Sequence, residues 1–455
     1  MTAQLTPDEL HSGGYDTVIV TAPDMSGRLL GKRLTPRKLQ ELAEPGIAIS
    51  TCVFGWDINQ DIGLEVPYAG WHTGWRDILM RPDMATLRPA AWLDRTAVVM
   101  ADLYEPETGE LVAVAPRTIL RRQLDAMAAA GRTAAVGTEL EFFLYRENYD
   151  ALRTGGYHTM TPSTLMHADY TVQQVNGWEH FFQPLRDALD RSGLDVELSQ
   201  GEWGLGQWEI NLTYGDAMDM ADRHVLFKLA VRDCAARAGM SATFMPKPVA
   251  DQVGSSCHIH LSMTDTGGSP IFYDAAADHF VSRSLRGAVA GILQHAPAFM
   301  TFYAPTINSY RRTNSEEFAG HGATWGYDNR TVSCRILGEH PGSVRAEWRV
   351  PGADVNPYLA IAALLASASA GIDEGLEPPG MHGGDAYRLD ADRSAIERFP
   401  TTLDESARLL SASPFALDAL GADVVEQYVL AALWEAKVYS HAVTDWEKAR
   451  YFEFI

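Results

Sequence analysis

Carboxylates at alternate positions of an otherwise apolar strand are the feature that most restricts how this chain can fold. Residues 134–145 (AAVGTELEFFLY) carry Glu139 and Glu141 among apolar and aromatic neighbours. Side chains two residues apart in a strand share one face, so both carboxylates point the same way. Buried carboxylates are costly unless a cation lies close by. This strand therefore predicts positive charge on one face of a sheet.

A second acidic pair lies in residues 199–210 (SQGEWGLGQWEI), where Glu202 and Glu209 flank a glycine-rich turn. Residues 194–198 before the turn and residues 208–212 after it favour extended backbone, which predicts a hairpin. Considered alone, the hairpin fits a pair of exposed surface acids as well as it fits a metal site.

Two histidines and a further glutamate occur at the same strand spacing. The segment GSSCHIHLSM carries His258 and His260, and the segment RAEWRV carries Glu347. A single buried histidine is usually structural, but two at alternate positions after a Gly-Ser-Ser turn favour a functional role. Oxygen-rich ligand sets with few nitrogens are typical of Mg²⁺ or Mn²⁺ sites and not of zinc. The candidate ligands are Glu139, Glu141, Glu202, Glu209, His258 and Glu347.

A two-metal cluster of this kind suits a reaction on a polyphosphate, whose oxygens the ions neutralise. Arginines also lie in the strand-like segments and the loops between them, and their planar donor groups match phosphate and carboxylate oxygens. These arginines are Arg312, Arg330, Arg335 and Arg349. The sequence has neither a P-loop nor a kinase-type glycine-rich loop, so a nucleotide site must be of another kind.

Composition excludes other partners and compartments. The 455 residues have a formal net charge of −22 and no run of Lys or Arg, which argues against a nucleic-acid partner. The four cysteines are scattered without a CxxC pair, so we expect reduced thiols in the cytoplasm. The start of the chain lacks a secretory signal. The apolar stretch 357–372 is short for a membrane span and predicts a buried helix.

The length of the chain and its turn residues predict two domains. Strand-prone stretches with little helix come first, at residues 15–22, 28–34, 47–54 and 97–103. Pro116 then opens a helix that Gly131 ends, and we place the boundary between residues 1–114 and residues 115–455. Helices are predicted after this boundary at 117–130, 178–192, 219–238, 279–296, 357–371, 402–410 and 424–444, with polar loops at 149–175 and from 308 onward.

Eight motifs, in this order along the chain, resemble the glutamine synthetase superfamily: GTELEF, GEWGLGQWEI, FMPKP, GSSCHIH, NSYRR, DNRTVSCR, RAEWRVPGADVNPYLA and VTDWEKARYF. The resemblance implies an α+β fold with a small N-terminal β-grasp domain and a large catalytic domain. It also implies a homo-oligomer with active sites at subunit junctions, namely a dodecamer of two hexameric rings.

The resemblance assigns a role to each candidate residue. One metal ion would be held by Glu141, Glu202 and Glu209, and the other by Glu139, His258 and Glu347. The cofactors implied are two or more Mg²⁺ or Mn²⁺ ions, with ATP as co-substrate. The other assignments are Arg330 and Arg335 at the transferred phosphoryl group, Arg335 and Ser262 at the nucleotide, and Arg312, Arg349 and Gly254 at glutamate.

The family reaction has two steps. ATP phosphorylates the γ-carboxylate of glutamate, and an amine then displaces phosphate to give an amide. The first step is chemically necessary because a carboxylate is a poor acyl donor until one oxygen becomes a leaving group. The attacking amine must lose a proton, which a nearby carboxylate such as Glu202 can accept.

Departures from the family pattern concern the amine. Glutamine synthetases carry a flap glutamate six residues after the second basic residue of their NSYKR motif, where this chain has Phe318, just after Glu316 and Glu317. Asp57, in the segment WDIN, is a loose match to the aspartate that holds ammonium. Val253 replaces an asparagine beside the glutamate-binding glycine.

Loss of a flap carboxylate removes a ligand for ammonium and adds an apolar wall at Phe318. The chain therefore resembles the γ-glutamyl-amine ligase branch more than the ammonium-using enzymes, with a polyamine or ethanolamine as acceptor. Two alternatives remain, an ordinary ammonium-using glutamine synthetase and a catalytically silent regulatory relative. The intact set of metal-ligand positions argues against the silent relative.

Overall fold

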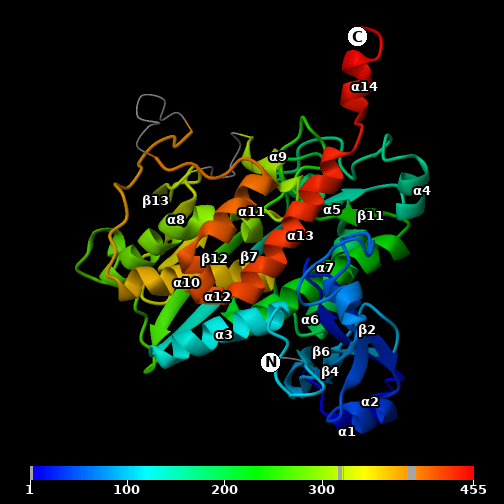
Figure 1. Cartoon of the computed structure of the whole chain (residues 1–455). Coiled ribbons are helices and arrows are strands. Elements are labelled where there is room, and N and C mark those ends of the chain that lie inside the picture. Colours follow the sequence, from blue (N-terminus) through cyan, green and yellow to red (C-terminus); the bar gives the residue numbers. More distant parts are fainter. Residues whose placement is uncertain (1–3, 316–319, 321, 388–395) are drawn as a thin grey trace.

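The first sheet is built from the strand-prone stretches near the start of the chain. The computed structural model describes residues 4–315, 320, 322–387 and 396–455. The strand order is β2-β1-β6-β4-β3 with β5 beside β6, and the bounds are β1 Thr17–Pro23, β2 Leu29–Leu34, β3 Ile47–Ser50, β4 Asp77–Pro82, β5 Arg88–Pro89 and β6 Thr96–Tyr104. Central β6 is buried up to its last residue, which agrees with its apolar run at residues 97–101. Helices α1 (Pro7–Ser12) and α2 (Pro36–Leu42) lie beside this sheet, at the lower right of Figure 1.

The second sheet is larger and has β7 at its centre. Its order is β13-β14-β15-β12-β7-β9-β8, with β10 and β11 also paired to β7. The bounds are β7 Arg132–Tyr145, β8 Val196–Gly201, β9 Gln207–Leu212, β10 Gly215–Asp216, β11 Ser241–Thr243, β12 Cys257–Asp265, β13 Trp325–Tyr327, β14 Cys334–Leu337 and β15 Arg345–Trp348. The antiparallel partners of β7 on its two sides are β9 and β12, so residues far apart in the chain meet across it.

Helices fill the rest of the large domain. They are α3 Pro116–Ala129, α4 Tyr149–Thr154, α5 Val172–Asn176, α6 Glu179–Arg191, α7 Ala217–Arg237, α8 Arg283–Tyr303, α9 Ser309–Thr313, α10 Pro357–Asp373, α11 Leu403–Ala412, α12 Pro414–Leu420, α13 Ala422–Ser440 and α14 Asp445–Tyr451. The apolar helix α10 is buried and packs on α8, as expected for a helix without a polar face. The two helices approach so closely that a Cβ on Gly291 would lie 2.1 Å from the carbonyl oxygen of Ser367.

The predicted α+β fold with a small N-terminal sheet is confirmed, and the predicted strands lie within a few residues of those observed. The boundary at residue 114 stays a prediction. The polar loop predicted at 149–175 is wrong in part, because it contains α4 and α5. The helix predicted at 279–296 begins later, since His279 has a φ of +54°, and it continues past Pro297 to Tyr303. Among the described residues, no helix is both long and apolar enough to cross a membrane.

The loop predicted from residue 308 onward begins instead with a buried helix, α9. Its polar side chains find partners inside the protein, which the sequence pattern does not reveal. The amide group of Asn308 bonds in both directions with the backbone of Lys247, at 2.8 and 3.0 Å. The hydroxyl of Ser309 donates to a carboxylate oxygen of Asp354 at 2.6 Å. Burial of α9 places Arg312 beneath the second sheet instead of in solvent.

A buried arginine forms ion pairs with residues of the first sheet and of the helices of the large domain. Arg117, at the start of α3, is 2% exposed and donates to both carboxylate oxygens of Asp222 on α7, at 3.0 and 2.7 Å. It also contacts Asp102 of β6 at 2.6 Å and Asp83 before β5 at 3.1 Å. The hydroxyl of Tyr358 donates to Asp222 at 2.6 Å. One guanidinium therefore joins the first sheet to the helices of the large domain.

We expect Asp222→Asn to lower the free energy of unfolding by about 3 kcal/mol, because it removes a buried counter-charge from Arg117. Asp187→Asn is the matched control, since Asp187 pairs with Arg191 where both side chains are 60% exposed. That change should cost less than about 1 kcal/mol. The midpoints of urea unfolding followed by circular dichroism measure both effects. Equal midpoints for the two variants would contradict a structural role for the Arg117 network.

Candidate active site

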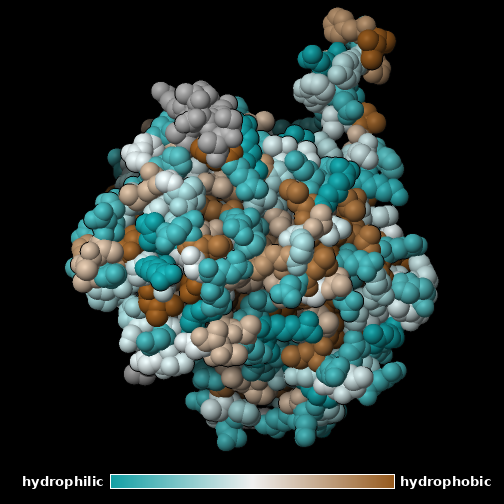
Figure 2. Space-filling view, turned by 60° about the vertical axis from the view of Figure 1, so that its left-hand side comes forward, coloured by the Kyte–Doolittle hydropathy of each residue, from teal (hydrophilic) through white to brown (hydrophobic). Residues whose placement is uncertain are grey.

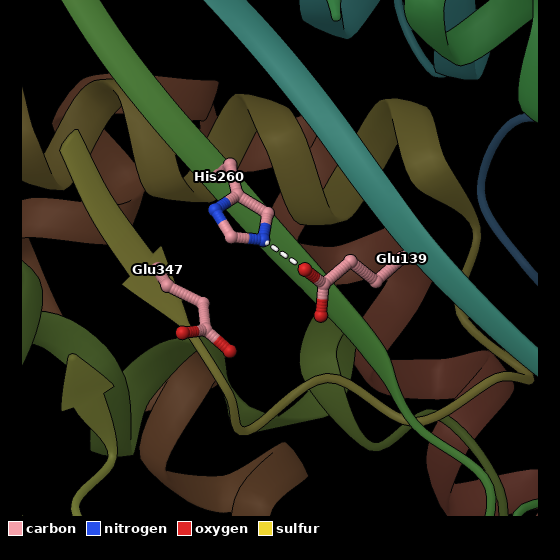
Figure 3. Close-up of side chains that lie close together, drawn as sticks. All are labelled: Glu139, His260 and Glu347. Carbon is pink, nitrogen blue, oxygen red and sulfur yellow. Dashed lines mark hydrogen bonds and ion pairs between the residues drawn. The ribbon is translucent and has the colours of Figure 1, made fainter. Parts of the chain in front are cut away.

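The register between strands gathers the predicted acidic residues on one face of the second sheet. Glu139 of β7 pairs with His258 of β12, and Glu141 of β7 pairs with Glu209 of β9. On the far side of β12, β15 contributes Glu347. Figure 3 looks onto this face and shows helices passing behind the three strands. Because Glu139 and Glu141 lie on one face of β7, that face brings together residues of both neighbouring strands, β12 and β9.

One half of the cluster is a set of hydrogen-bonded acids and histidines. Nδ1 of His258 lies 3.1 Å from Oε2 of Glu139 and 3.4 Å from Oε1 of Glu347. Nε2 of His260 lies 2.7 Å from Oε1 of Glu139. Ligand atoms of Glu139, His260 and Glu347 all lie within 4.8 Å of one another, as Figure 3 shows. These are distances at which one cation can reach several of the groups.

The two histidines differ in what their nitrogens do. The Nε group of Arg345 donates to Nδ1 of His260 at 3.0 Å, so Nε2 of that ring carries the proton that Glu139 accepts. Both nitrogens of His260 are therefore engaged. Nε2 of His258 is buried and has no hydrogen-bond partner among the residues that the structure describes. His260, which the sequence-based ligand set omitted, lies with Glu139 and Glu347 in the group whose ligand atoms are close together, and it also bonds Glu139; the ligand role of His258 stays a prediction.

Positive charge controls ionisation in this half. Burial raises the pKa of Glu139, but hydrogen bonds from His258 and His260 outweigh it and leave the pKa below its ordinary value. Burial likewise raises the pKa of Glu347, and the charge of Arg349 is the largest of the effects that outweigh it and leave the pKa below its ordinary value. Burial and then the charge of Arg349 lower the pKa of His258, which favours the neutral imidazole that a metal requires. Both carboxylates are ionised at neutral pH.

The other half of the cluster is acidic without compensation. Glu141 is fixed by Nε2 of Gln207 at 2.8 Å, by the backbone N–H of Ser256 at 2.9 Å and by the Ser256 hydroxyl. Burial, followed by the charge of Glu141, raises the pKa of Glu202 to about 8. The same two causes, with the charge of Glu202, raise the pKa of Glu209 to about 10. Three carboxylates thus crowd one place with no cationic side chain bonded to them in the described part of the chain.

This donor set fits divalent cations. Three crowded carboxylates are oxygen donors that Mg²⁺ and Mn²⁺ prefer, and one neutral histidine nitrogen with two carboxylates completes a second set. A cation would offset the repulsion that raises the pKa of Glu202 and Glu209. Nδ1 is the nitrogen of His258 that faces Glu139 and Glu347, so it is the atom that could share a cation with them.

Two of the predicted arginines border the cluster. Arg349 donates to Oε1 of Glu347, and Arg335 donates to its Oε2 at 3.1 Å. Arg335 also donates to Asp328 at 2.5 Å. Arg330 lies in the loop before β14 and is exposed. The predicted phosphoryl-binding side chains therefore lie at the open side of the sheet.

Arg312 and Gly254 lie together beneath the cluster. Arg312 is buried and donates to the carbonyl oxygens of Val350 at 2.8 Å and of Arg349 at 3.1 Å. A Cβ on Gly254 would lie 2.7 Å from Cγ of Arg312, so this close approach requires glycine. The carbonyl of Gly254 accepts from Gln207 at 3.0 Å. The predicted adenine contact, Ser262, continues along β12 on the same face as the two histidines.

Two predicted amine-site residues are not brought to the cluster by the described part of the chain. Phe318 lies outside the described residues. Asp57 accepts hydrogen bonds from the backbone N–H groups of Asn59 at 2.8 Å and Asp61 at 3.0 Å, and from Nε1 of Trp434 at 3.5 Å. It lines a cavity of about 420 Å³ together with Glu435. None of the six candidate metal ligands lines this cavity.

Comparison with known proteins supports the assignment of this site. The family model for the glutamine synthetase catalytic domain matches residues 113–451. The γ-glutamylethanolamide synthetase of Streptomyces coelicolor is 40% identical, and the alignment covers 99% of this chain and 96% of that protein. A glutamate–isopropylamine ligase from a Pseudomonas species is 32% identical, with 98% and 97% covered.

Solved structures lead to the same family. A ligand-free structure of the protein GmaS superposes with a TM-score of 0.85 at 26% identity and covers 99% of this chain and 100% of that one. The match includes both the N-terminal sheet and the strands that carry the acidic cluster. This chain is a member of the glutamine synthetase family of carbon–nitrogen ligases.

Proposed function

We propose that this chain is an ATP-dependent ligase that joins the γ-carboxylate of glutamate to a small alkylamine such as ethanolamine or a polyamine. The observation that carries the proposal is its nearly full-length match to two relatives named for an amine acceptor. Both names specify a carbon-bearing amine and not ammonium. An acid or a histidine at all six predicted ligand positions supports an active enzyme over a silent relative.

The chemistry proceeds through an acyl phosphate. The γ-carboxylate oxygen of glutamate attacks the γ-phosphorus of ATP, an O–P bond forms, and ADP leaves. The amine loses a proton and attacks the γ-carbonyl carbon, a C–N bond forms, and the C–O bond to phosphate breaks. The sum is glutamate, amine and ATP to γ-glutamyl amide, ADP and phosphate. Side chains of this site hold the two anions together and accept the proton.

Two or more Mg²⁺ or Mn²⁺ ions are the proposed cofactors. Glu141, Glu202 and Glu209 would hold one ion, and Glu139, His258 and Glu347 the other. Bound divalent cations would neutralise the phosphate oxygens of ATP. The protein's part is orientation, because Ser256 and Gln207 fix Glu141 while His260 fixes Glu139.

The arginines are proposed to bind anionic groups. Arg330 and Arg335, at the open side of the sheet, would bind the transferred phosphoryl group, and Arg335 would also contact ATP beside Ser262. Arg349 and Arg312 would bind glutamate together with Gly254. Burial lowers the pKa of Arg312, which is the response of a cation whose bonded partners are neutral carbonyl groups. A carboxylate substrate would supply the missing charge.

The amine is proposed to meet Glu202, whose carboxylate accepts its proton. Phe318 would then form an apolar wall, in keeping with an acceptor that bears carbon. Asp57 can serve as an amine-site carboxylate only if another copy of the chain brings it there, since within one chain it lies at the separate cavity.

A homo-oligomer, namely a dodecamer of two hexameric rings, is therefore part of the proposal. Helix α14 and the residues after it stand away from the body of the molecule in Figure 1. Figure 2 shows hydrophobic side chains at the tip of this segment, and Trp446, Phe452, Phe454 and Ile455 are all strongly exposed. A second copy of the chain is the partner that would bury them. The four unpaired cysteines are in keeping with a cytoplasmic enzyme.

The acceptor is tested by ADP release with glutamate and each of ethanolamine, isopropylamine, putrescine, spermine and ammonium. We expect kcat/KM for at least one alkylamine to exceed that for ammonium by about tenfold or more, because each buried carbon adds binding energy. Glu209→Gln, which lacks one predicted metal ligand, is the inactive control. A clear preference for ammonium would show an ordinary glutamine synthetase, and no turnover with any amine would show a silent relative.

Metal affinity should rise with pH, because Glu202 must be ionised to bind a cation and its pKa is raised to about 8. For this one group we expect the Mg²⁺ affinity measured by calorimetry to increase about tenfold between pH 7 and pH 9. The stability of the metal-free protein should change in the opposite direction. Because the pKa of the Glu202 carboxyl is raised in the folded state, the free energy of unfolding should fall as the pH rises from about 4.5 to 8. Glu202→Gln should flatten the pH dependence of affinity; the same slope in this variant would contradict the assignment.

Removal of residues 443–455 should reduce the mass of the assembly measured by light scattering after gel filtration. Helix α14 is capped within itself, where Thr444 and Glu447 exchange hydrogen bonds, so its loss leaves the core contacts intact. Far-ultraviolet circular dichroism checks that the shortened chain stays folded. A monomeric full-length chain, or an unchanged mass after truncation, would exclude this segment as an assembly contact.

A further inference from the structure

A carboxylate with no bonded partner lies next to the proposed proton acceptor. Asp169 forms an isolated bridge with Gly201, the residue before Glu202, so the loop between α4 and α5 is held against the end of β8. Asp169 is half-buried. No hydrogen bond or ion pair to its carboxylate exists within the described part of the chain. A partly exposed carboxylate without a protein donor can accept a charged ligand from solution.

The carboxylate of Asp169 interacts electrostatically with Arg330 and with Glu202. Burial raises its pKa, and the charge of Arg330, the proposed phosphoryl-binding arginine, partly offsets this effect. The negative charge of Asp169 is in turn one of the causes, after burial and Glu141, that raise the pKa of Glu202. Asp169 is therefore within electrostatic reach of the place where amine and acyl phosphate would meet.

An exposed indole belongs to Trp203, the residue that follows Glu202 in the chain. Trp203 is 56% exposed, although large aromatic side chains usually bury most of their surface. Its ring lies over His167 with centroids 4.9 Å apart, and the backbone carbonyl of Trp203 lies 2.5 Å from Nδ1 of that histidine. These contacts hold the indole against His167, which lies two residues before Asp169. Aromatic faces attract cations and cover alkyl groups.

We propose that Asp169 and Trp203 form the acceptor site, in which Asp169 binds the ammonium group of the incoming amine and Trp203 covers its carbon chain. The proposal rests on the proposed function and names the form in which that acceptor is recognised, a primary alkylammonium cation. Free ammonium engages the carboxylate but has no carbon to place on the indole. The pair therefore provides selection for carbon-bearing amines from described residues alone.

Binding is measured first, by calorimetric titration of the full-length protein with isopropylammonium chloride at fixed ionic strength. We expect Asp169→Asn to weaken binding about tenfold, because it removes a charged partner for the cation. Glu197→Gln is the matched control, since Glu197 is an exposed acid on β8 and its loss changes net charge equally. This control should bind isopropylammonium as the parent does.

The indole is tested with two substitutions and two cations. Trp203→Leu should weaken isopropylammonium binding about twofold to fivefold while leaving the affinity for ammonium unchanged. Trp203→Phe, which keeps an aromatic face, should recover part of the loss. In steady state, Asp169→Asn should raise KM for the amine and leave KM for glutamate and for ATP unchanged.

The outcomes separate this inference from the proposed function. A parent protein that releases no ADP with any amine contradicts the ligase proposal, whereas the titrations still decide the cation site. A parent that does not bind isopropylammonium, or an Asp169→Asn variant that binds it as well as the parent, overturns the site. A Trp203→Leu variant that changes assembly mass but not amine affinity assigns the indole to a subunit contact instead.

Discussion

Uncompensated negative charge at Glu141, Glu202 and Glu209 is the constraint on which the rest of the structure depends. The strand register forces two of these carboxylates together across β7 and β9, and burial raises the pKa of both Glu202 and Glu209. Such an arrangement weakens the folded state, so stability must come from elsewhere. The closely packed helices α8 and α10 and the buried Arg117 network provide it, away from the cluster. The site can then keep excess negative charge, which a bound divalent cation would offset.

The two halves of the cluster differ in how the charge of their buried carboxylates is compensated. Around Glu139 and Glu347, arginine and histidine side chains hold the carboxylates ionised before any ligand arrives. Among the residues that the structure describes, no cationic side chain is bonded to Glu202. A group with a raised pKa near neutral pH is suited to exchange a proton, whereas a group fixed by ion pairs is suited to orient a neighbour. The half around Glu139 and Glu347 is thus suited to orientation, and the raised pKa of Glu202 agrees with its proposed role as proton acceptor.

Local patterns in the sequence predict the strands that carry the cluster, because alternation at residues 139 and 141 and at 258 and 260 depends only on strand geometry. Side-chain contacts between residues that are far apart in the sequence cannot be predicted from such local patterns. His260 shares the alternation, yet its task as partner of Glu139 depends on Arg345, which only strand pairing brings close. The buried helix α9 depends likewise on Lys247 and Asp354. Asp57 was predicted from a loose motif, and its position at a separate cavity follows from tertiary packing.

The predicted metal ligands and the proposed acceptor residues lie on different kinds of segment, which affects how the amine specificity could vary between related enzymes. The predicted metal ligands lie on paired strands or directly after one, where register fixes them, whereas Asp169 and Trp203 lie on connecting segments. Loops tolerate substitution because few backbone pairings depend on them. The acyl-phosphate chemistry can therefore stay constant on the sheet while loop residues change which amine completes the reaction. The proposed acceptor residues, Asp169 and Trp203, would add charge recognition and apolar contact without moving any predicted metal ligand, so acceptor specificity would be physically separable from activation of glutamate.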